Sequence, residues 1–339
     1  MVLISRQIGA FVKPLVFVLL DLNINVFCVI RSAGERTAGA CRKLVEASLP
    51  AGRVAVVELH PFETALQECY RLGIESGATW LLTVDADVLL QPERIPELIR
   101  AAEAMPNHYV QLEGRIFDKV FGVFRQAGHR VYRVKLLPLA LKSIPKPGSE
   151  LRPEFSTLQE LGRLGHPSRR VATVAGVHDF EQWYRDLYRK SFIHARKHRQ
   201  DIVALVDRAT SLAADDADFR VILKGIWDGL IDARSVSIDT NLFTERYCQA
   251  LSELGLAEKE PLALEANLFG EAWLAQRMEF NPPKMAIFDM PSSTLTETAS
   301  QRFKRLTEAH GVFRAACYSI ASIGESSFRK VKNGFIKAD

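Results

Sequence analysis

Two aspartates one residue apart stand at the end of a buried apolar run. Asp85-Ala-Asp87 follows Trp80-Leu-Leu-Thr-Val84, whose composition is typical of a strand covered on both faces. Carboxylates at the carboxyl end of such a strand lie where open α/β sheets bind ligands. Both can hold one hard cation of the Mg²⁺ or Mn²⁺ kind, or one can bind the cation while the other reaches a ribose hydroxyl. The competing interpretation is a pair of solvated loop residues or helix caps.

Strands and helices alternate ahead of this motif. We expect strands at 26–30, 54–59 and 80–84, and helices at 38–48, 62–76 and 92–104. Strand-helix repeats with short connections predict an α/β fold with a parallel, doubly wound sheet.

The later part of the chain has a different pattern. Further strands are expected at 109–117, 130–137 and 169–175, with a proline-rich loop at 143–154. A helix is expected at 179–199, with Asp179 as its N-cap and Gln182 three residues on, in the capping-box arrangement.

Composition limits the class of protein. The 339 residues are 47% apolar and 25% charged, as in an ordinary soluble globular protein. The formal net charge of +4 is too small to predict a nucleic-acid partner, while a phosphate-bearing small ligand or an anionic membrane surface fits it. Five widely spaced cysteines without a CxxC pair indicate neither a disulfide framework nor a zinc knuckle, and favour a reducing cytoplasm.

The N-terminal segment is apolar but interrupted. Residues 11–30 are rich in Val, Leu, Ile and Phe, yet Lys13, Pro14, Asp21 and Asn23 break the run before it could span a bilayer. We therefore expect an extension at 1–24, ahead of the first strand.

Five segments together resemble a known family. They are 26–31, 54–58, Ala65-Leu-Gln-Glu-Cys-Tyr-Arg71, 73–77 and 80–87. This series is similar to the nucleotide-binding half of GT-A glycosyltransferases, particularly the family-two group. It departs from many members after the first strand, where Arg31-Ser32 replaces Pro-x-Tyr-Asn.

The resemblance implies roles for particular residues. Arg31 and Glu58 would contact the nucleoside, Arg71 would lie near the diphosphate, and Asp85 and Asp87 would form the metal motif, with Asp85 also near the donor nucleotide. GT-A enzymes commonly supply a third metal ligand from a late histidine, and His178 in Gly176-Val-His178-Asp-Phe stands at that place. The competing interpretation is that this histidine only precedes a helix cap.

Inverting transfer also needs a general base, because the acceptor hydroxyl loses its proton as it attacks. The sequence leaves Glu113, Asp118, Glu154 and Asp179 open for this role. The basic helix at 185–199 faces either a diphosphate, a membrane surface or solvent.

The sequence therefore predicts three segments after the extension. They are a GT-A catalytic domain at 25–200, a helical appendage at 201–282 and a tail at 283–339 with one helix.

The expected activity is metal-dependent transfer of a sugar from a UDP- or GDP-sugar, with Mn²⁺ or Mg²⁺. The acceptor would be a glycan, a lipid-linked molecule or a protein, in bacterial surface polysaccharide or glycoconjugate synthesis. The expected location is the cytoplasm, with peripheral association at the inner face of the membrane left open.

Three other classes share part of this pattern. A haloacid-dehalogenase phosphatase would place its aspartates after the first strand, and here two strand-helix units precede Asp85. A sugar-phosphate nucleotidyltransferase would show a glycine-rich, basic loop after the first strand, and 31–37 is only faintly so. A non-catalytic binding protein that keeps the fold remains the third alternative.

Overall fold

The computed structural model describes residues 25–150, 152–197, 202–232, 243–262 and 288–289. The chain divides into two compact units, Met1–Met290 and Pro291–Asp339, and the second unit lies wholly outside the described residues. The expected extension at 1–24 and nearly all of the expected tail at 283–339 also lie outside them.

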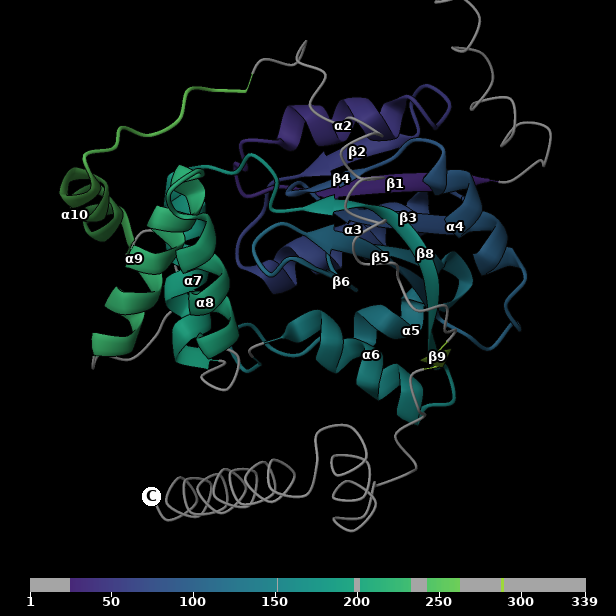
Figure 1. The fold of residues 1–339 in the computed structure, drawn as a ribbon. Helices are drawn as coiled ribbons and strands as arrows, with labels where there is room; N and C mark the ends of the chain where they lie inside the picture. The colour runs from purple at the N-terminus through teal and green to yellow at the C-terminus, as the bar shows by residue number, and fades with distance from the viewer. Residues whose placement is uncertain (1–24, 151, 198–201, 233–242, 263–287, 290–339) are drawn as a thin grey trace, which may run out of the picture. The chain divides into compact units, whose positions relative to one another are not determined.

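The described strands form one mixed sheet in the order β2-β1-β3-β7-β5-β8-β4, with β6 paired to β5 and β9 to β8 (Figure 1). The strands β1, β2 and β3 are parallel, whereas β7 runs antiparallel between β3 and β5, and β4 runs antiparallel to β8. The strands are β1 Val26–Arg31, β2 Val54–Val57, β3 Trp80–Asp85, β4 Val88–Leu90, β5 Gln111–Asp118, β6 Val123–Arg125, β7 His129–Arg133, β8 Ser168–His178 and β9 Phe288–Asp289. The predicted α/β class is confirmed, with parallel pairing among β2, β1 and β3 and again between β5 and β8.

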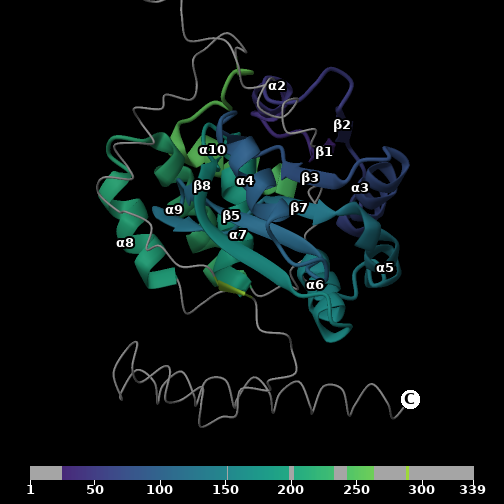
Figure 2. The same cartoon turned by 90° about the vertical axis from the view of Figure 1, so that its right-hand side faces the viewer.

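Helices cover both faces of the sheet (Figures 1 and 2). One apolar core joins the sheet to α2 (Ala38–Glu46) and α4 (Arg94–Glu103). The core on the opposite face joins it to α3 (Phe62–Glu75), α5 (Leu137–Lys142) and α6 (Pro153–Arg163). Successive residues of β1 alternate between these cores, as the two-residue period of a strand requires.

Two expected boundaries in this region were wrong. The strand expected at 130–137 ends at Arg133, where the 3-10 turn η1 (Val134–Leu136) leads directly into α5. The segment expected to be a loop up to residue 154 gives way to α6 at Pro153, because proline is well suited to the first turn of a helix.

The start of α7 (Tyr184–Lys197) also corrects the sequence prediction. The expected capping box does not form, because Asp179 and Glu181 have φ of 57° and 59°, in the left-handed region that cannot begin a right-handed helix. The cap comes from far along the chain: the carboxylate of Glu258 accepts hydrogen bonds from the backbone N–H groups of Tyr184 and Arg185, at 2.8 and 3.1 Å.

Helix α7 shares an apolar core with α8 (Ile202–Leu212), α9 (Ala217–Ile231) and α10 (Thr244–Leu254). The contact between α7 and α9 is very close at Gly225, where a Cβ atom would lie 2.2 Å from Ser191 Oγ and 2.6 Å from the carbonyl oxygen of Tyr188. The expected domain boundary near residue 200 falls within this helical group and stays a prediction. No described helix has the length and apolar character needed to cross a membrane.

Candidate metal centre

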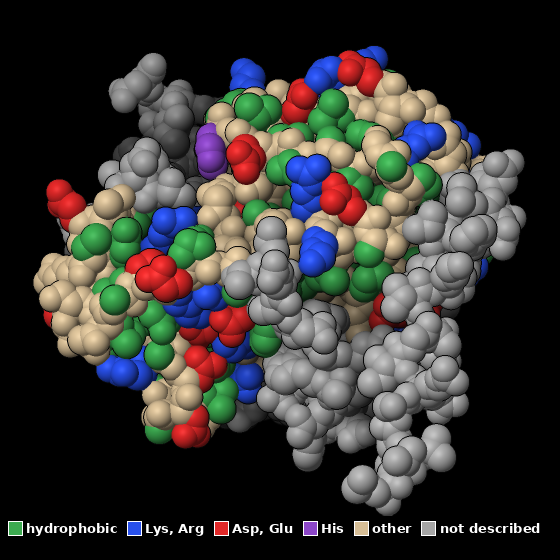
Figure 3. Space-filling view, turned by 90° about the horizontal axis from the view of Figure 1, so that it is seen from above, with side chains coloured by type: hydrophobic (Ala, Val, Ile, Leu, Met, Phe, Trp, Pro, Cys, Tyr) green, Lys and Arg blue, Asp and Glu red, His purple; other side chains and the backbone are tan. Residues whose placement is uncertain are grey.

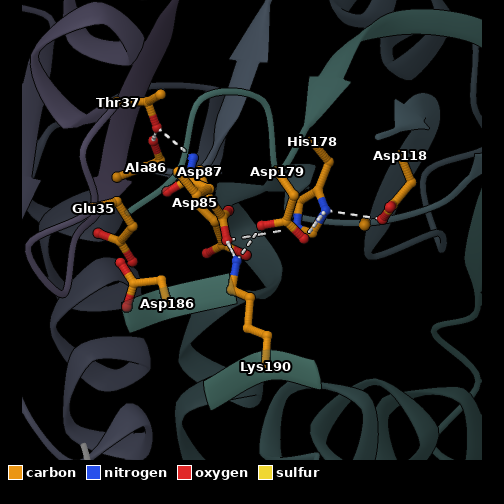
Figure 4. Close-up of polar contacts among 12 residues, drawn as sticks. Glu35, Thr37, Asp85, Ala86, Asp87, Asp118, His178, Asp179, Asp186 and Lys190 are labelled. Atoms are coloured by element: carbon orange, nitrogen blue, oxygen red, sulfur yellow. Dashed lines mark hydrogen bonds and ion pairs between the residues drawn. The ribbon is translucent and has the colours of Figure 1, made fainter. Parts of the chain in front are cut away.

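The register of three strands brings the polar side chains of the site together. His178, the last residue of β8, lies opposite Val88 of β4 and opposite Asp118 of β5. Asp87 directly precedes β4, and its carbonyl oxygen accepts a hydrogen bond of 3.1 Å from the backbone N–H of Asp179. Figure 4 shows these side chains converging at one edge of the sheet.

Asp87, His178 and Asp179 form what we call the metal group. Each offers one ligand atom, and these atoms lie within 4.8 Å of one another. His178 Nε2 is 3.6 Å from Asp87 Oδ2, and His178 Nδ1 is 3.0 Å from Asp179 Oδ2. Asp87 Oδ1 is buried without a hydrogen-bond partner among the described residues. Two carboxylates, an imidazole and this spare oxygen fit a divalent cation such as Mn²⁺ or Mg²⁺.

Asp118 lies behind the histidine. It is fully buried, and its Oδ2 is 3.0 Å from His178 Nδ1. Its carboxylate also accepts hydrogen bonds from Arg125 Nε at 2.7 Å and from the backbone N–H of Phe121 at 2.9 Å. A carboxylate held in this way orients the imidazole, so that Nε2 faces Asp87.

A lysine from α7 enters the metal group from the helical side. Lys190 Nζ donates to Asp87 Oδ2 at 2.5 Å and also to Asp179 Oδ1 (Figure 4). Burial opposes charge here, but Lys190 and His178 hold the pKa of Asp87 below its usual range. Burial would likewise lower the pKa of His178, yet Asp179 and Asp87 raise it to about 10.

Asp85 belongs to a neighbouring group. Arg31 stands beside it in the register of β1 and β3 and donates from Nε to Asp85 Oδ1 at 2.7 Å. The same guanidinium donates to both carboxylate oxygens of Glu154, at 3.0 and 3.3 Å. Tyr132 Oη donates to Glu154 Oε1 at 2.8 Å, and Arg130 also contacts this carboxylate. Burial raises the pKa of Asp85, and Arg31 counters part of that rise.

Gly128 allows the backbone to pass close to Asp85. Its φ is 65°, and its carbonyl oxygen accepts a 2.7 Å hydrogen bond from the backbone N–H of Asp85. A Cβ at this position would lie 2.4 Å from Val88 Cγ2 and 3.3 Å from Asp85 Oδ2. A larger residue here would therefore disturb the turn between β3 and β4.

The remaining candidates for the general base are buried in ion pairs. Glu113 lies 3.2 Å from Arg130 and 3.9 Å from Arg170, although burial raises its pKa. Glu154 is held by two arginines, which lower its pKa to about 2 against the effect of burial. Asp179 lies in the metal group itself.

Two residues expected to contact the nucleotide lie outside both groups. Glu58 is exposed in the loop after β2. Arg71 is on an exposed face of α3, where it pairs with Glu68 and Glu75. The structure therefore does not bring Arg71 to the metal group, because its guanidinium is held by carboxylates of its own helix.

Two acidic residues near the metal group were not predicted from the sequence. Glu35, in the loop after β1, and Asp186, on α7, lie beside Asp87 and Lys190 (Figure 4). Burial raises the pKa of both carboxyls, and Asp87 adds to the effect. The signal for Glu35 was its place after the carboxyl end of a parallel strand, while nothing local marks Asp186.

No family model matches this chain, and no curated protein matches it. Solved structures similar to it include the mannosyltransferase PcManGT from Pyrobaculum calidifontis in complex with GDP-Man and Mn²⁺, at 13% identity over 87% of each chain and a TM-score of 0.37. A glycosyltransferase involved in the glycosylation of the major capsid of PBCV-1 is 13% identical over 45% of this chain and 94% of its own, at 0.34. A CMP:2-keto-3-deoxy-manno-octonic acid synthetase complexed with CTP is 10% identical over 45% and 91%, at 0.32. These likenesses assign no activity to the chain.

Proposed function

We propose that this protein is a divalent-metal-dependent glycosyltransferase that moves a sugar from a nucleotide-sugar donor to an acceptor. The observation that carries the proposal is the metal group. Asp87, His178 and Asp179 come from two separate parts of the chain and meet at the sheet edge where α/β folds bind ligands. The spare buried oxygen of Asp87 favours a ligand there, since an unpaired buried carboxylate oxygen is costly.

In this proposal the metal group binds the cation, and the neighbouring group around Asp85 contacts the donor nucleotide. Asp87, His178 and Asp179 would hold Mn²⁺ or Mg²⁺, and Asp118 would keep His178 in the correct orientation. Asp85, fixed by Arg31, would accept a hydrogen bond from a ribose hydroxyl of the donor. The bound cation would neutralise the charge that develops on the departing diphosphate. Glu58 remains our proposed contact to the nucleoside.

Binding of nucleoside diphosphates tests this function directly. We expect UDP or GDP to bind in the presence of Mn²⁺ and to lose most of its affinity in EDTA. Asp87→Asn keeps the shape of the side chain and removes its charge, so it should abolish the Mn²⁺-dependent part of binding. Asp215→Asn, on the exposed turn before α9, is the matched control and should bind as the wild type does.

Isothermal titration calorimetry with both nucleotides gives the answer. If neither nucleotide binds with Mn²⁺, or if D87N and D215N behave alike, the proposal is wrong. If the nucleotides do bind, a second measurement distinguishes the two enzyme classes. A glycosyltransferase releases free UDP or GDP from a nucleotide sugar in the presence of acceptor, whereas a nucleotidyltransferase releases pyrophosphate.

A further inference from the structure

Lys190 contacts two of the three residues of the metal group. Its Nζ lies 2.5 Å from Asp87 Oδ2 and also donates to Asp179 Oδ1. The side chain is 29% exposed, so its charge is partly shielded from water. These are two of the oxygens that a divalent cation would need, and a cation binds such oxygens at about 2.0–2.6 Å. A cation that binds these two oxygens therefore competes with the ammonium for them.

The helix that carries Lys190 is fixed from its other side. At Gly225 and Gly229 the backbone of α9 approaches α7 so closely that a Cβ would lie 2.6 Å from the carbonyl oxygen of Tyr188 and 2.5 Å from that of Phe192. Phe192 is buried in the core shared by these helices. Since α7 cannot easily retreat, only the flexible side chain of Lys190 is free to move away from the carboxylates.

Several carboxyl groups surround Lys190, and Glu35 and Asp186 lie beside it as well (Figure 4). The carboxylates of Asp87, Asp118 and Asp179 face Lys190, Arg125 and the imidazole of His178. A divalent cation adds positive charge at the same place, so the displaced ammonium moves towards other negative charge. A diphosphate bound to that cation brings negative charge within reach of the same side chain.

We propose that Lys190 is a built-in counter-ion that competes with the divalent cation for Asp87 and Asp179, so that the cation binds strongly only together with a nucleoside diphosphate. The inference rests on the proposed function, because it assumes that the metal group binds a cation. Cation and nucleotide are then positively coupled, and each raises the affinity for the other by the same factor. Lys190 is the residue that creates this coupling.

Mn²⁺ binding to the whole protein tests the inference. Free Mn²⁺ is measured by electron paramagnetic resonance, without nucleotide and with saturating UDP or GDP. Lys190→Gln should bind Mn²⁺ alone at least about tenfold more tightly than the wild type, since two contacts no longer need to be broken; tenfold corresponds to about 1.4 kcal/mol. The nucleotide should tighten Mn²⁺ binding strongly in the wild type and much less in K190Q.

Two controls separate the lysine from general electrostatics. Arg189→Gln removes the same charge from the neighbouring position of α7, where Arg189 pairs with Asp186 at 3.7 Å, and should leave Mn²⁺ affinity near the wild-type value. Lys190→Arg keeps the charge and should bind Mn²⁺ as weakly as the wild type. If K190Q binds Mn²⁺ no more tightly than the wild type, or if R189Q matches K190Q, the inference is overturned while the proposed function stands.

Three further results are also decisive. If Mn²⁺ binds to none of these proteins, with or without nucleotide, the metal site does not exist and the inference is wrong. A K190Q protein that folds only with Mn²⁺ present supports the inference, because the cation replaces the missing charge. A K190Q protein that stays unfolded with and without Mn²⁺ contradicts it.

Discussion

At the scale of single residues, Glu154 holds Arg31, and Arg31 in turn holds Asp85. Glu154 is 6% exposed and joins Arg31, Arg130 and Tyr132 in one buried network. Removing one partner of a buried ion pair leaves the other charge uncompensated, which is far more costly than losing an exposed pair.

We therefore expect Glu154→Gln to lower the free energy of unfolding by about 3–5 kcal/mol, because Arg31 and Arg130 each lose one of their carboxylate partners in a buried network. Glu160→Gln on the same helix removes an exposed pair with Arg163 at 2.9 Å and should cost under about 1 kcal/mol. Urea denaturation of the two variants at neutral pH compares them. Equal losses would mean that the buried network contributes no more than a surface pair.

His129 gives stability a dependence on pH. Burial lowers the pKa of His129 from 6.5 to about 4, although its Nδ1 lies 3.0 Å from the carbonyl oxygen of Ala127. His129 therefore becomes protonated near pH 6.5 in the unfolded chain but only near pH 4 in the folded protein. This contribution to stability is complete above pH 6.5 and is lost as the pH falls from 6.5 to 4.

The expected loss over that range is at most about 3–4 kcal/mol. His129→Asn keeps a donor for the carbonyl oxygen of Ala127 and does not titrate, so the difference in unfolding free energy between wild type and variant should shrink as the pH falls. Urea denaturation at several pH values between 7.5 and 4 measures this. A constant difference would show that His129 titrates alike in both states.

At the scale of elements, the contact between α7 and α9 decides where Lys190 lies. Gly225→Ala would place a methyl group 2.2 Å from Ser191 Oγ and 2.6 Å from a backbone oxygen of α7, and a backbone atom cannot turn aside. We expect a loss of about 1–3 kcal/mol from overpacking.

Gly162→Ala is the matched control, on α6. A Cβ there meets no described atom within 4 Å, so the substitution should stabilise the protein by about 0.5–1 kcal/mol through the lower entropy of the unfolded chain. Thermal unfolding of both variants tests the pair. A G225A protein as stable as G162A would mean that the two helices separate without cost.

The sequence predicts some of these elements well and others poorly, for physical reasons. The strands that end at Arg31 and Asp85 are short apolar runs buried on both faces, and local composition is enough to find them. The predicted start of α7 at Asp179 was wrong because the residue that caps the helix, Glu258, lies more than 70 residues downstream. No local motif extends that far.

The site divides in the same way. The residues next to Asp85 and Asp87 in the sequence were enough to predict them. The side chains that surround His178 depend on the pairing of β8 with both β4 and β5. Asp85 and Asp87 also have different partners, since Arg31 contacts Asp85 and Lys190 contacts Asp87. Local sequence contains neither register nor the position of a helix that arrives a hundred residues later.

At the scale of the whole described unit, charges of both signs are interspersed on the surface rather than gathered by sign on the face shown in Figure 3. Ion pairs also tie the sheet to the helical group. Lys119, just after β5, lies 2.9 Å from Asp216 and 2.6 Å from Asp218, and Lys259 lies 2.6 Å from the same Asp218. The position of α9, and through it of α7, is thus set by charges as well as by apolar contacts.

Removal of metal should leave this unit folded, because Lys190 already compensates the carboxylates of the metal group. We expect EDTA to shift the thermal midpoint by less than about 2 °C, or under about 1 kcal/mol. Mn²⁺ and nucleotide together, at about 100 times their dissociation constant, should add about 2.7 kcal/mol. Differential scanning calorimetry decides between this result and a large loss in EDTA, which would indicate a structural metal.

The distant cap of α7 has a consequence for the growing chain. Proteins made on the ribosome fold from the N-terminal side as they emerge, and β1 to β8 are complete before the residue that caps α7 exists. Until Glu258 has been added, the first amides of α7 lack the carboxylate that receives them in the finished protein. Lys190, which contacts Asp87 and Asp179, therefore reaches its final position late in synthesis, after the strands β1 to β8 have been made.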